Sequence, residues 1–362
     1  MNVATVPRHG PRGARLLVID DHRQISHHTA ADLPRFIRRN DLIVANDAAT
    51  LPASLAGIHE RTGRSIEIRL AGRTSLAPHA VRHFLAVVFG EGDYRTPTER
   101  RHAPPRLCPD DRLTFGTLHA HVLRVLSHPR LIEITFDAMP RVIWQYLSRH
   151  ATAIQYAYLA EPLDIWDTWT AIASQPVAFE APSAGFILDW ATVRQIKSRG
   201  ARFATITHAA GISSTGDPEL DRLLPFDEPY EIPASTAALI ADAKRKRGRV
   251  IAVGTTVVRA LEHSAGRHGC VAAGPGLATN RIGPATSLRI VDGIVSGMHE
   301  RGSSHYDLLR AFHADDSLDR MSVEAERHDY RSHEFGDAVF VIRDQNREIV
   351  DDDQRCARRI SA

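Results

Sequence analysis

The stretch Val250-Ile251-Ala252-Val253-Gly254-Thr255-Thr256-Val257-Val258-Arg259 decides the fold class of this chain. Its four leading apolar residues predict a buried strand. Gly254 lets the backbone turn tightly, and the hydroxyl of Thr255 or Thr256 can cap a helix that continues to about His263. A buried strand that runs directly into a helix is typical of an α/β sheet.

This junction is also the best local candidate for a ligand site. The first turn of a helix presents free backbone N–H groups and the positive end of the helix dipole. Ligands of open α/β sheets lie at the carboxyl ends of strands. A plain turn with a capping threonine is the alternative that the spacing leaves open. The chain has neither a phosphate loop with Gly-Lys-Thr nor a G-x-G-x-x-G turn after a strand, so the two commonest nucleotide motifs are excluded.

The flanking sequence extends the α/β pattern in both directions, because short apolar runs alternate with segments of helical spacing. We expect strands at residues 14–20, 41–47 and 202–207, and helices at residues 190–198 and 234–246. A glycine follows each of these helices at a position where it can end the helix.

Residues 60–155 show a different pattern. Alternating runs at residues 65–70, 119–126 and 131–136, with glycines and prolines between them, predict antiparallel β structure. We therefore expect a β domain inserted into an α/β domain. The predicted divisions are an α/β domain at residues 1–58 and 156–345, an inserted β domain at residues 59–155, and a charged tail at residues 346–362.

The composition is that of an ordinary globular protein, with 43% hydrophobic and 24% charged residues in a chain of 362. No run of about 18 apolar residues and no apolar N-terminal segment is present, so we expect a cytoplasmic protein without a membrane segment. The scattered Cys108, Cys270 and Cys356 fit a reducing compartment and disfavour a thiolate zinc site. No H-E-x-x-H motif occurs and His27-His28 has no obvious metal partner nearby, so we expect no metal. A monomer is the default expectation for the oligomeric state.

The net charge bears on nucleic-acid binding. A dedicated nucleic-acid binder often has a large basic excess, because neutralised phosphates drive its affinity. Here 45 basic residues face 43 acidic ones, which gives a net charge of +2. This balance disfavours tRNA as a partner, although basic side chains gathered on one face would still allow it.

Residues 288–304 carry a candidate catalytic histidine. Asp292-Gly293 between two apolar runs predicts a hairpin turn, or else a strand pair interrupted by a bulge. His299 follows on a loop, before a helix that Ser304 can cap together with Asp307. Histidine is the usual group for proton transfer near neutral pH, although an isolated loop histidine is commonly a solvated bystander.

Three further segments could touch a ligand. The segment Glu180-Ala181-Pro182-Ser183-Ala184-Gly185 contains small residues that permit close approach of backbone and ligand, or it simply forms a tight turn. The segment Asp227-Glu228-Pro229-Tyr230-Glu231 could accept ribose hydroxyls or bind a cation, or be a solvated loop. The basic run Lys244-Arg245-Lys246-Arg247-Gly248-Arg249 could touch phosphate, or complement the carboxyl end of a helix.

Taken in order, these segments resemble the S-adenosylmethionine:tRNA ribosyltransferase-isomerase family of queuosine biosynthesis. The family's Val-Ile-Ala-Val-Gly-Thr-Thr, followed by Val-Arg and Leu-Glu, resembles residues 250–262, and its Ala-Pro-Thr-Ala-Gly resembles residues 181–185. The other similar segments are residues 46–55, Thr62-Gly63 before Ile66-Glu67, residues 291–304 and residues 330–338. The resemblance covers about residues 14–342.

The resemblance implies a mixed α/β domain with an inserted antiparallel β-barrel-like domain. It also implies a transferase-isomerase that uses S-adenosylmethionine as a co-substrate. The ribosyl group is transferred to a 7-aminomethyl-7-deazaguanine base in tRNA and rearranges to the epoxycyclopentane of epoxyqueuosine, with release of adenine and methionine. The sulfonium acidifies the adjacent C5′ hydrogens, so this reaction needs a base, and the departing adenine needs an acid.

The local patterns and the resemblance together give the predicted site. We expect His299 and Glu228 to be catalytic. We expect S-adenosylmethionine to be held by Asn46, Asp47, Ser183, Ala184, Gly185, Gly254, Thr255, Thr256, Arg259, Ser303 and Ser304.

Several side chains of the family pattern are absent. Its Gly-Leu-His-Phe-Thr becomes Gly185-Phe186-Ile187-Leu188-Asp189, and its early Asn-Asp-Thr-Arg ends in Ala48 and Ala49. Alanine cannot replace the rigid fork with which arginine binds phosphate or carboxylate. Three alternatives therefore stay open: the family reaction on tRNA, an S-adenosylmethionine-dependent enzyme with a non-tRNA acceptor, and a non-catalytic nucleoside- or RNA-binding relative.

Overall fold

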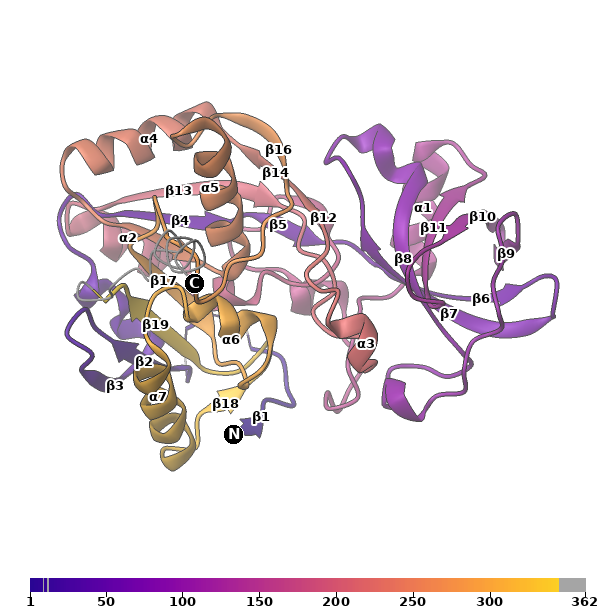
Figure 1. Cartoon of the computed structure of the whole chain (residues 1–362), viewed down its shortest axis with the longest axis horizontal. Helices are drawn as coiled ribbons and strands as arrows, with labels where there is room; N and C mark the ends of the chain where they lie inside the picture. The colour runs from indigo at the N-terminus through magenta and orange to yellow at the C-terminus, as the bar shows by residue number, and fades with distance from the viewer. Residues whose placement is uncertain (9, 12, 345–362) are drawn as a thin grey trace, which may run out of the picture.

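The computed structural model describes residues 1–344 except residues 9 and 12. A nine-stranded mixed sheet forms the centre of the larger domain (Figure 1). In spatial order its strands are β16 (Gly274–Ala278), β14 (Glu228–Ile232), β13 (Arg202–His208), β4 (Leu42–Asn46), β15 (Val250–Val253), β17 (Gly293–Gly297), β19 (Ala338–Ile342), β2 (Arg15–Ile19) and β3 (Ile25–Thr29). The central strands β13, β4, β15 and β17 run parallel, so their carboxyl ends meet at one edge of the sheet.

Helices cover both faces of this sheet. α4 (Ala234–Arg245) and α5 (Thr255–His268) pack on one face, and α2 (Trp190–Ser198) packs on the other. Successive residues of β4 alternate between the two cores: Leu42 and Val44 face α4 and α5, whereas Ile43 and Ala45 face the side of α2. Because both faces of the sheet are buried, β15 is apolar throughout, as its sequence predicts.

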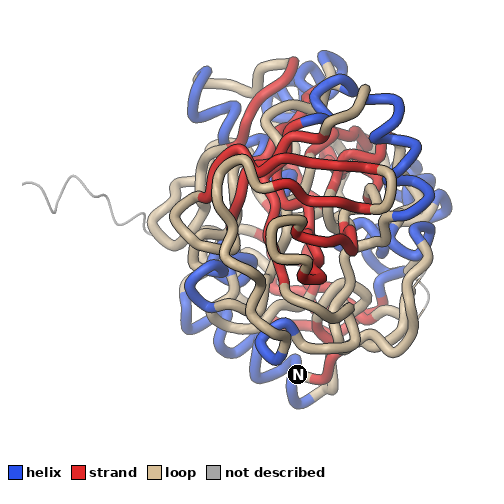
Figure 2. The backbone as a smooth tube through the Cα atoms, turned by 90° about the vertical axis from the view of Figure 1, so that its right-hand side faces the viewer, coloured by secondary structure: helices blue, strands red, loops and turns tan. Residues whose placement is uncertain are grey.

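Six antiparallel strands close into a barrel at one end of the molecule (Figures 1 and 2). Around the barrel these are β10 (Leu118–Val125), β11 (Leu131–Phe136), β8 (His83–Phe89), β7 (Arg64–Gly72), β6 (Ser54–His59) and β9 (Arg112–Phe115). The helix α1 (Pro140–His150) adds Ile143 and Leu147 to the barrel core. Phe179 of the larger domain also enters this core, where its ring meets Phe84 edge to face at 6.0 Å.

Two short strand pairs and three more helices complete the fold. β5 (Ala48–Thr50) pairs with β12 (Gln175–Ala178) between the domains, and β1 (Asn2–Val3) pairs with β18 (Arg331–Ser332). The remaining α-helices of the described residues are α3 (Pro218–Asp221), α6 (Ser304–Leu309) and α7 (Asp315–Arg327).

The predicted fold class is confirmed, because the chain forms an α/β domain with a closed antiparallel barrel. Strands β2 and β4 and helices α2 and α4 fall within the ranges that their patterns predict, and β13 extends one residue beyond its predicted range. The exact domain divisions stay a prediction, and the first barrel strand begins at Ser54. The predicted tail at residues 346–362, with Cys356, lies outside the described residues.

The predicted hairpin at Asp292-Gly293 is wrong. Gly293 begins β17, and residues 288–292 form neither the opposing strand nor a bulged pair. The backbone N–H groups of Arg289, Ile290 and Val291 donate instead to the carboxylate of Glu262 on α5, at 2.8 to 2.9 Å. This buried carboxylate supplies the acceptors that a β ladder would otherwise provide.

Two predicted helix caps are also wrong. The N-cap of α5 is Gly254, and neither Thr255 nor Thr256 caps the helix with its side chain. The N-cap of α6 is Ser303, whose hydroxyl accepts a hydrogen bond from the Tyr306 N–H, and Ser304 is the first helical residue. The observed cap lies one residue before the predicted one. Neighbouring serines carry the same hydroxyl, so the sequence alone does not distinguish them.

Candidate active site

A cavity of about 480 Å³ lies at the carboxyl ends of the central parallel strands. Gly254 follows β15 and lines one wall, Gly297 ends β17, and Gly211 follows β13. The segments at residues 180–184, 298–308 and 332–334 complete its walls. The position agrees with the general rule for ligand sites in open α/β sheets.

The Gly-Thr-Thr turn presents the start of α5 to this cavity. Gly254 has φ 101°, a conformation that side-chain-bearing residues rarely adopt, and a methyl group there would lie 3.6 Å from the Cβ of Ala184. Because no side chain caps the 14-residue helix, the first N–H groups of α5 are free to meet a ligand. Asn46 donates a hydrogen bond to the hydroxyl of Thr256 at 3.3 Å and so orients it.

A network of acids and tyrosines forms the opposite part of the site. Glu180 is buried, its Oε1 accepts a hydrogen bond from the Tyr156 hydroxyl, and its Oε2 accepts one from the Ser213 N–H at 3.1 Å. Glu334 accepts a hydrogen bond from the Tyr158 hydroxyl. Burial and the nearby Glu334 raise the pKa of Glu180 to about 7, while its hydrogen bonds act in the opposite direction. The site therefore contains a carboxyl that can gain and lose a proton at neutral pH.

Three histidines lie together in the same cavity. The rings of His299 and His305 stack at a centroid distance of 4.3 Å, and His333 also lines the cavity. Burial lowers the pKa of His299 well below its usual value, and the neighbouring histidines add to this effect. Burial and Arg259 lower the pKa of His305 to about 4. Both rings are therefore neutral at pH 7, with one N–H donor and one acceptor nitrogen each.

Glu228 and Arg259 form a buried ion pair in the floor of the cavity. Oε2 of Glu228 accepts from Nη1 of Arg259, and Oε1 accepts from the Gly211 N–H at 2.6 Å. Arg259 also donates to the backbone carbonyls of Phe226 and Ala278, both at 3.1 Å. Burial raises the pKa of Glu228, and the charge of Arg259 opposes that shift. The predicted solvated loop around Glu228 is in fact the buried strand β14.

The structure brings most of the predicted site residues to one cavity. Those that line it are His299, Glu228, Ser183, Ala184, Gly254, Thr255, Thr256, Arg259, Ser303 and Ser304. Asn46, Asp47 and Gly185 do not line it: Asn46 lies behind Thr256, Asp47 accepts a hydrogen bond from Thr207, and Gly185 packs against Thr170. The predicted contacts of these three residues with S-adenosylmethionine stay predictions, as do the roles of the lining residues.

Sequence reasoning missed six residues at this cavity. Glu180, Glu334, His305 and His333 line it, and Tyr156 and Tyr158 donate hydrogen bonds to the carboxylates of Glu180 and Glu334. Glu180 begins the segment whose small residues mark it as a candidate, so its position carried a local signal. Only the fold shows that these six residues meet.

The altered family positions lie away from the cavity. Ala48 and Ala49 are buried in β5, beside β12. Ile187, which stands in place of the family's histidine, packs in the core on the α2 face of the sheet. Asp189 caps α2 by accepting a hydrogen bond from the Thr192 N–H at 2.6 Å.

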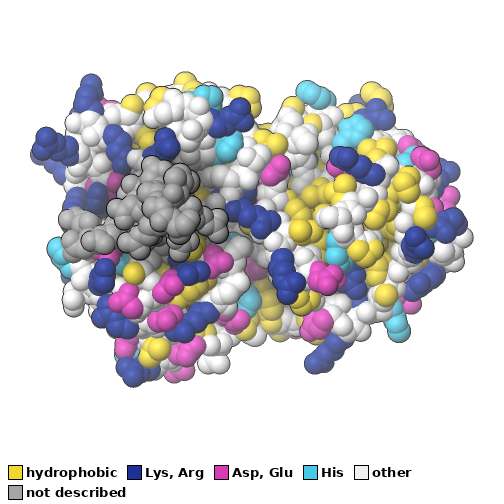
Figure 3. Space-filling view, in the orientation of Figure 1, with side chains coloured by type: hydrophobic (Ala, Val, Ile, Leu, Met, Phe, Trp, Pro, Cys, Tyr) yellow, Lys and Arg dark blue, Asp and Glu magenta, His cyan; other side chains and the backbone are white. Residues whose placement is uncertain are grey.

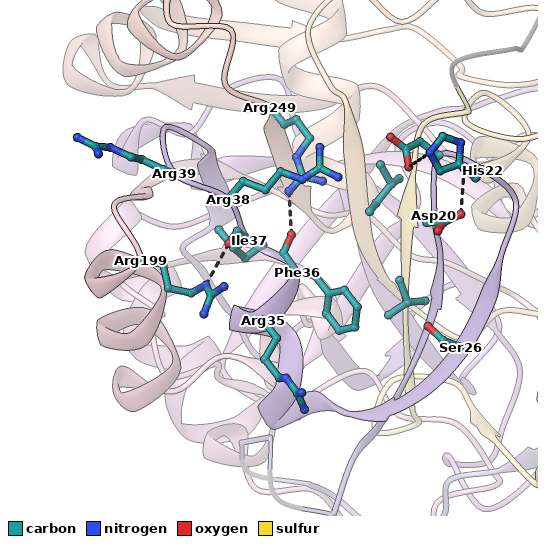
Figure 4. A pocket seen from close by; sticks show the side chains of 13 residues that line it. Asp20, His22, Ser26, Arg35, Phe36, Ile37, Arg38, Arg39, Arg199 and Arg249 are labelled. Carbon is teal, nitrogen blue, oxygen red and sulfur yellow. Dashed lines mark hydrogen bonds and ion pairs between the residues drawn. The ribbon is translucent and has the colours of Figure 1, made fainter.

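A larger open depression, of about 850 Å³, lies at the opposite edge of the sheet (Figure 4). Several arginines border it, but Arg249 is paired with Asp41 and Arg199 donates to the carbonyl of Ile37. The side chains of Arg35 and Arg39 point away from each other in Figure 4. Asp20 and Asp21 also line this depression, so its charge is mixed, and the smaller cavity is the better candidate for chemistry.

The predicted phosphate-binding alternative for the basic run is not favoured. Lys244 pairs with Asp292 at 2.7 Å and Lys246 pairs with Asp242 at 2.8 Å, at the carboxyl end of α4. On the face shown in Figure 3, basic and acidic side chains are interspersed over both domains.

Among the described residues, the helices are too short or too polar to cross a bilayer.

Comparisons with known proteins agree with this architecture. The profile of a family described as queuosine biosynthesis protein matches residues 1–341. Relatives named S-adenosylmethionine:tRNA ribosyltransferase-isomerase include one from Sorangium cellulosum, 30% identical over 94% of this chain and 95% of its own. Another, from Gloeobacter violaceus, is 29% identical over 94% of this chain and 92% of its own.

A solved structure shows the same fold. The S-adenosylmethionine tRNA ribosyltransferase from Thermotoga maritima is 22% identical and matches with a TM-score of 0.50, over 94% of this chain and 96% of that one. With a family profile that spans nearly the whole chain, and a fold and cavity that fit it, this protein belongs to the queuosine biosynthesis protein family.

Proposed function

We propose that this protein is an S-adenosylmethionine:tRNA ribosyltransferase-isomerase. In this proposal it transfers the ribosyl group of S-adenosylmethionine to a 7-aminomethyl-7-deazaguanine base in tRNA, in the cytoplasm, and isomerises it to the epoxycyclopentane. The observation that carries the proposal is one cavity that joins an uncapped helix N-terminus to a buried carboxyl with a pKa of about 7. The relatives that share most of the chain carry this enzyme's name.

The acid and tyrosine network suits the cationic part of the co-substrate. A sulfonium carries a positive charge, which the carboxylates of Glu180 and Glu334 would attract. We assign Glu180 as the base that takes the C5′ proton, because a carboxylate with a raised pKa is a stronger base than an ordinary one. Binding of the sulfonium lowers the pKa of Glu180 and so favours its reactive form.

The histidines and the Gly-Thr-Thr turn suit the adenine, ribose and carboxylate groups of S-adenosylmethionine. A neutral His299 can donate one hydrogen bond and accept another, which fits the edge of the departing adenine. The N–H groups at the start of α5 and the hydroxyls of Thr255 and Thr256 can bind ribose or carboxylate oxygens. The ion pair of Glu228 with Arg259 holds the floor of the site, because both oxygens of Glu228 are already engaged within the protein.

A small molecule is the second candidate for the ribosyl acceptor. The net charge of +2 and the interspersed charges of Figure 3 favour a small-molecule acceptor over a large polyanion. The chemistry at the co-substrate would be the same in that case, and only the recipient of the ribosyl group would differ.

The test measures product release from S-adenosylmethionine. The purified protein is incubated with tRNA that carries the 7-aminomethyl-7-deazaguanine base, and with the same tRNA that carries guanine instead. Release of adenine and methionine only with the modified tRNA, together with a mass increase of that tRNA, is the expected result. Release without any tRNA, or no release with either tRNA, would contradict the proposed acceptor.

A further inference from the structure

Two histidines and a glutamate from distant parts of the chain meet on the surface of the larger domain. His27 lies on β3, the edge strand of the central sheet, whereas Glu324 and His328 lie at the carboxyl end of α7. One ligand atom from each residue lies within 4.8 Å of the others. None of the three residues lines the cavity of the proposed active site, and they play no part in the proposed reaction.

The spacing of these atoms matches that of a small tetrahedral metal site. Oε2 of Glu324 lies 3.7 Å from Nε2 of His27 and 3.5 Å from Nε2 of His328. Zinc bound to nitrogen and oxygen at about 2.0–2.1 Å separates tetrahedral ligand atoms by about 3.3–3.4 Å. Glu324 and His328 stand four residues apart, which places them on the same side of a helix end.

The neighbours of the cluster orient these atoms. Nδ1 of His27 is hydrogen-bonded to the hydroxyl of Tyr330 at 3.1 Å, which leaves Nε2 to face Glu324. Arg327 donates to Oε1 of Glu324 at 3.0 Å, which leaves Oε2 to face both histidines. A hydrogen bond on the far nitrogen of a histidine is the usual arrangement around a protein-bound metal.

We propose that His27, Glu324 and His328 form a binding site for a transition-metal dication, with zinc as the best fit. Two imidazoles and one carboxylate provide three ligands, as in many zinc sites that keep a fourth position for water. Partial exposure of all three side chains leaves that position open to solvent. No local spacing in the sequence predicts this set, because His27 is separated from Glu324 by nearly three hundred residues.

The site would join the edge of the sheet to the end of α7. Tyr330, which contacts His27, also lies under the guanidinium of Arg15 at 4.3 Å from the ring centroid. Arg15 in turn pairs with Asp337 at 3.0 Å. Metal binding would therefore stabilise the segment between α7 and β19, which carries His333 and Glu334 to the cavity.

The experiment measures metal binding to the full chain, purified without an affinity tag and freed of metal. Zinc affinity is determined by calorimetry, and cobalt is used as a spectroscopic probe of the coordination geometry. We expect one zinc per chain, intense visible absorption of tetrahedral cobalt, and a higher Tm with zinc. The variants His27→Ala and Glu324→Gln are each expected to weaken zinc binding by about tenfold or more.

The matched control is His28→Ala. The adjacent histidine is hydrogen-bonded to Ser26 and lies against Phe36, so its removal should leave zinc affinity unchanged. Circular dichroism and the Tm of each metal-free variant show whether it is folded. Equal zinc affinity in the wild type, His27→Ala and Glu324→Gln, or a weak octahedral cobalt spectrum, would overturn the proposal. Because the readouts do not involve S-adenosylmethionine, they are independent of the proposed enzymatic function.

Discussion

Tyr156 donates its hydroxyl hydrogen to the buried carboxyl of Glu180. This hydrogen bond lowers the pKa of Glu180, whereas burial and the neighbouring Glu334 raise it, and the balance lies at about 7. A carboxyl held at that balance is half ionised at the pH of a cell. Substitution of either residue should therefore change the chemistry of the cavity.

Glu180→Gln is expected to lower kcat/KM by about a hundredfold or more, because it removes the proposed base without changing the shape of the side chain. In the wild type, kcat/KM should rise with pH through about 7 as the carboxylate forms, and this limb should be lost in the variant. Steady-state release of adenine across pH 5.5–8.5 measures both effects. Glu91→Gln, an exposed carboxylate outside the cavity, is the control. An unchanged pH profile in Glu180→Gln would rule out this base.

The same carboxyl should make stability depend on pH. Folding raises the pKa of Glu180 to about 7, so the protonated form favours the folded state. Its contribution is complete below the unfolded pKa of about 4.5 and is lost as pH rises through about 7. The free energy of unfolding of the wild type, minus that of Glu180→Gln, should therefore decrease across this interval. Urea titrations at pH 4.5, 6 and 7.5 measure the difference, and a constant difference would contradict burial of the group.

Tyr156→Phe removes one hydrogen bond from the Glu180 carboxylate. The pKa of Glu180 should rise further, and the rising limb of kcat/KM should move to higher pH. Tyr146→Phe changes a tyrosine of α1 that packs on His150 and leaves the cavity intact, so its profile should match the wild type. A shift of the limb to lower pH in Tyr156→Phe would be the contrary result.

Gly254→Ala tests the turn at the start of α5. The backbone at φ 101° makes alanine unfavourable by about 1–3 kcal/mol, and the displaced N–H groups should weaken S-adenosylmethionine binding by about tenfold. Gly269→Ala lies at the other end of the same helix, at φ 75°, with no atom within 4 Å of the added methyl. It should lose similar stability but bind the co-substrate normally. Calorimetry of both variants separates strain from binding, and equal weakening in both would remove the turn from the site.

Arg259→Met tests the ion pair in the floor of the cavity. It leaves the carboxylate of Glu228 buried without its partner, which should cost about 3–5 kcal/mol of unfolding free energy. The double variant Arg259→Met with Glu228→Gln should recover part of this loss, because no charge is then left uncompensated. Chemical denaturation of the two proteins measures the difference. No recovery in the double variant would show that the backbone contacts of Arg259, rather than its charge, dominate.

The sequence predicted those parts of the molecule that depend on local pattern. The apolar run of β15 and its glycine turn fix a strand, a turn and a helix, because burial and backbone freedom act over a few residues. The hairpin was wrong because a distant side chain, that of Glu262, accepts hydrogen bonds from the backbone of residues 289–291. The two caps were wrong because the residue just before each predicted cap takes the position instead.

The candidate site was predictable only in its backbone frame. His299 and the Gly-Thr-Thr turn follow from position on the chain, but the raised pKa of Glu180 depends on burial against Tyr156 and Glu334. Burial and long-range charge are properties of the folded chain, so no local spacing reports them.

The ring of Phe179 fills the barrel core, where it meets Phe84, and Glu180 is the next residue along the chain. The barrel is therefore not a passive attachment. One peptide bond separates a side chain clamped in one domain from the carboxyl that we assign to catalysis in the other. A macromolecule that binds the barrel and displaces it would also displace Glu180. Binding of a large acceptor would then be coupled to the position of the proposed base.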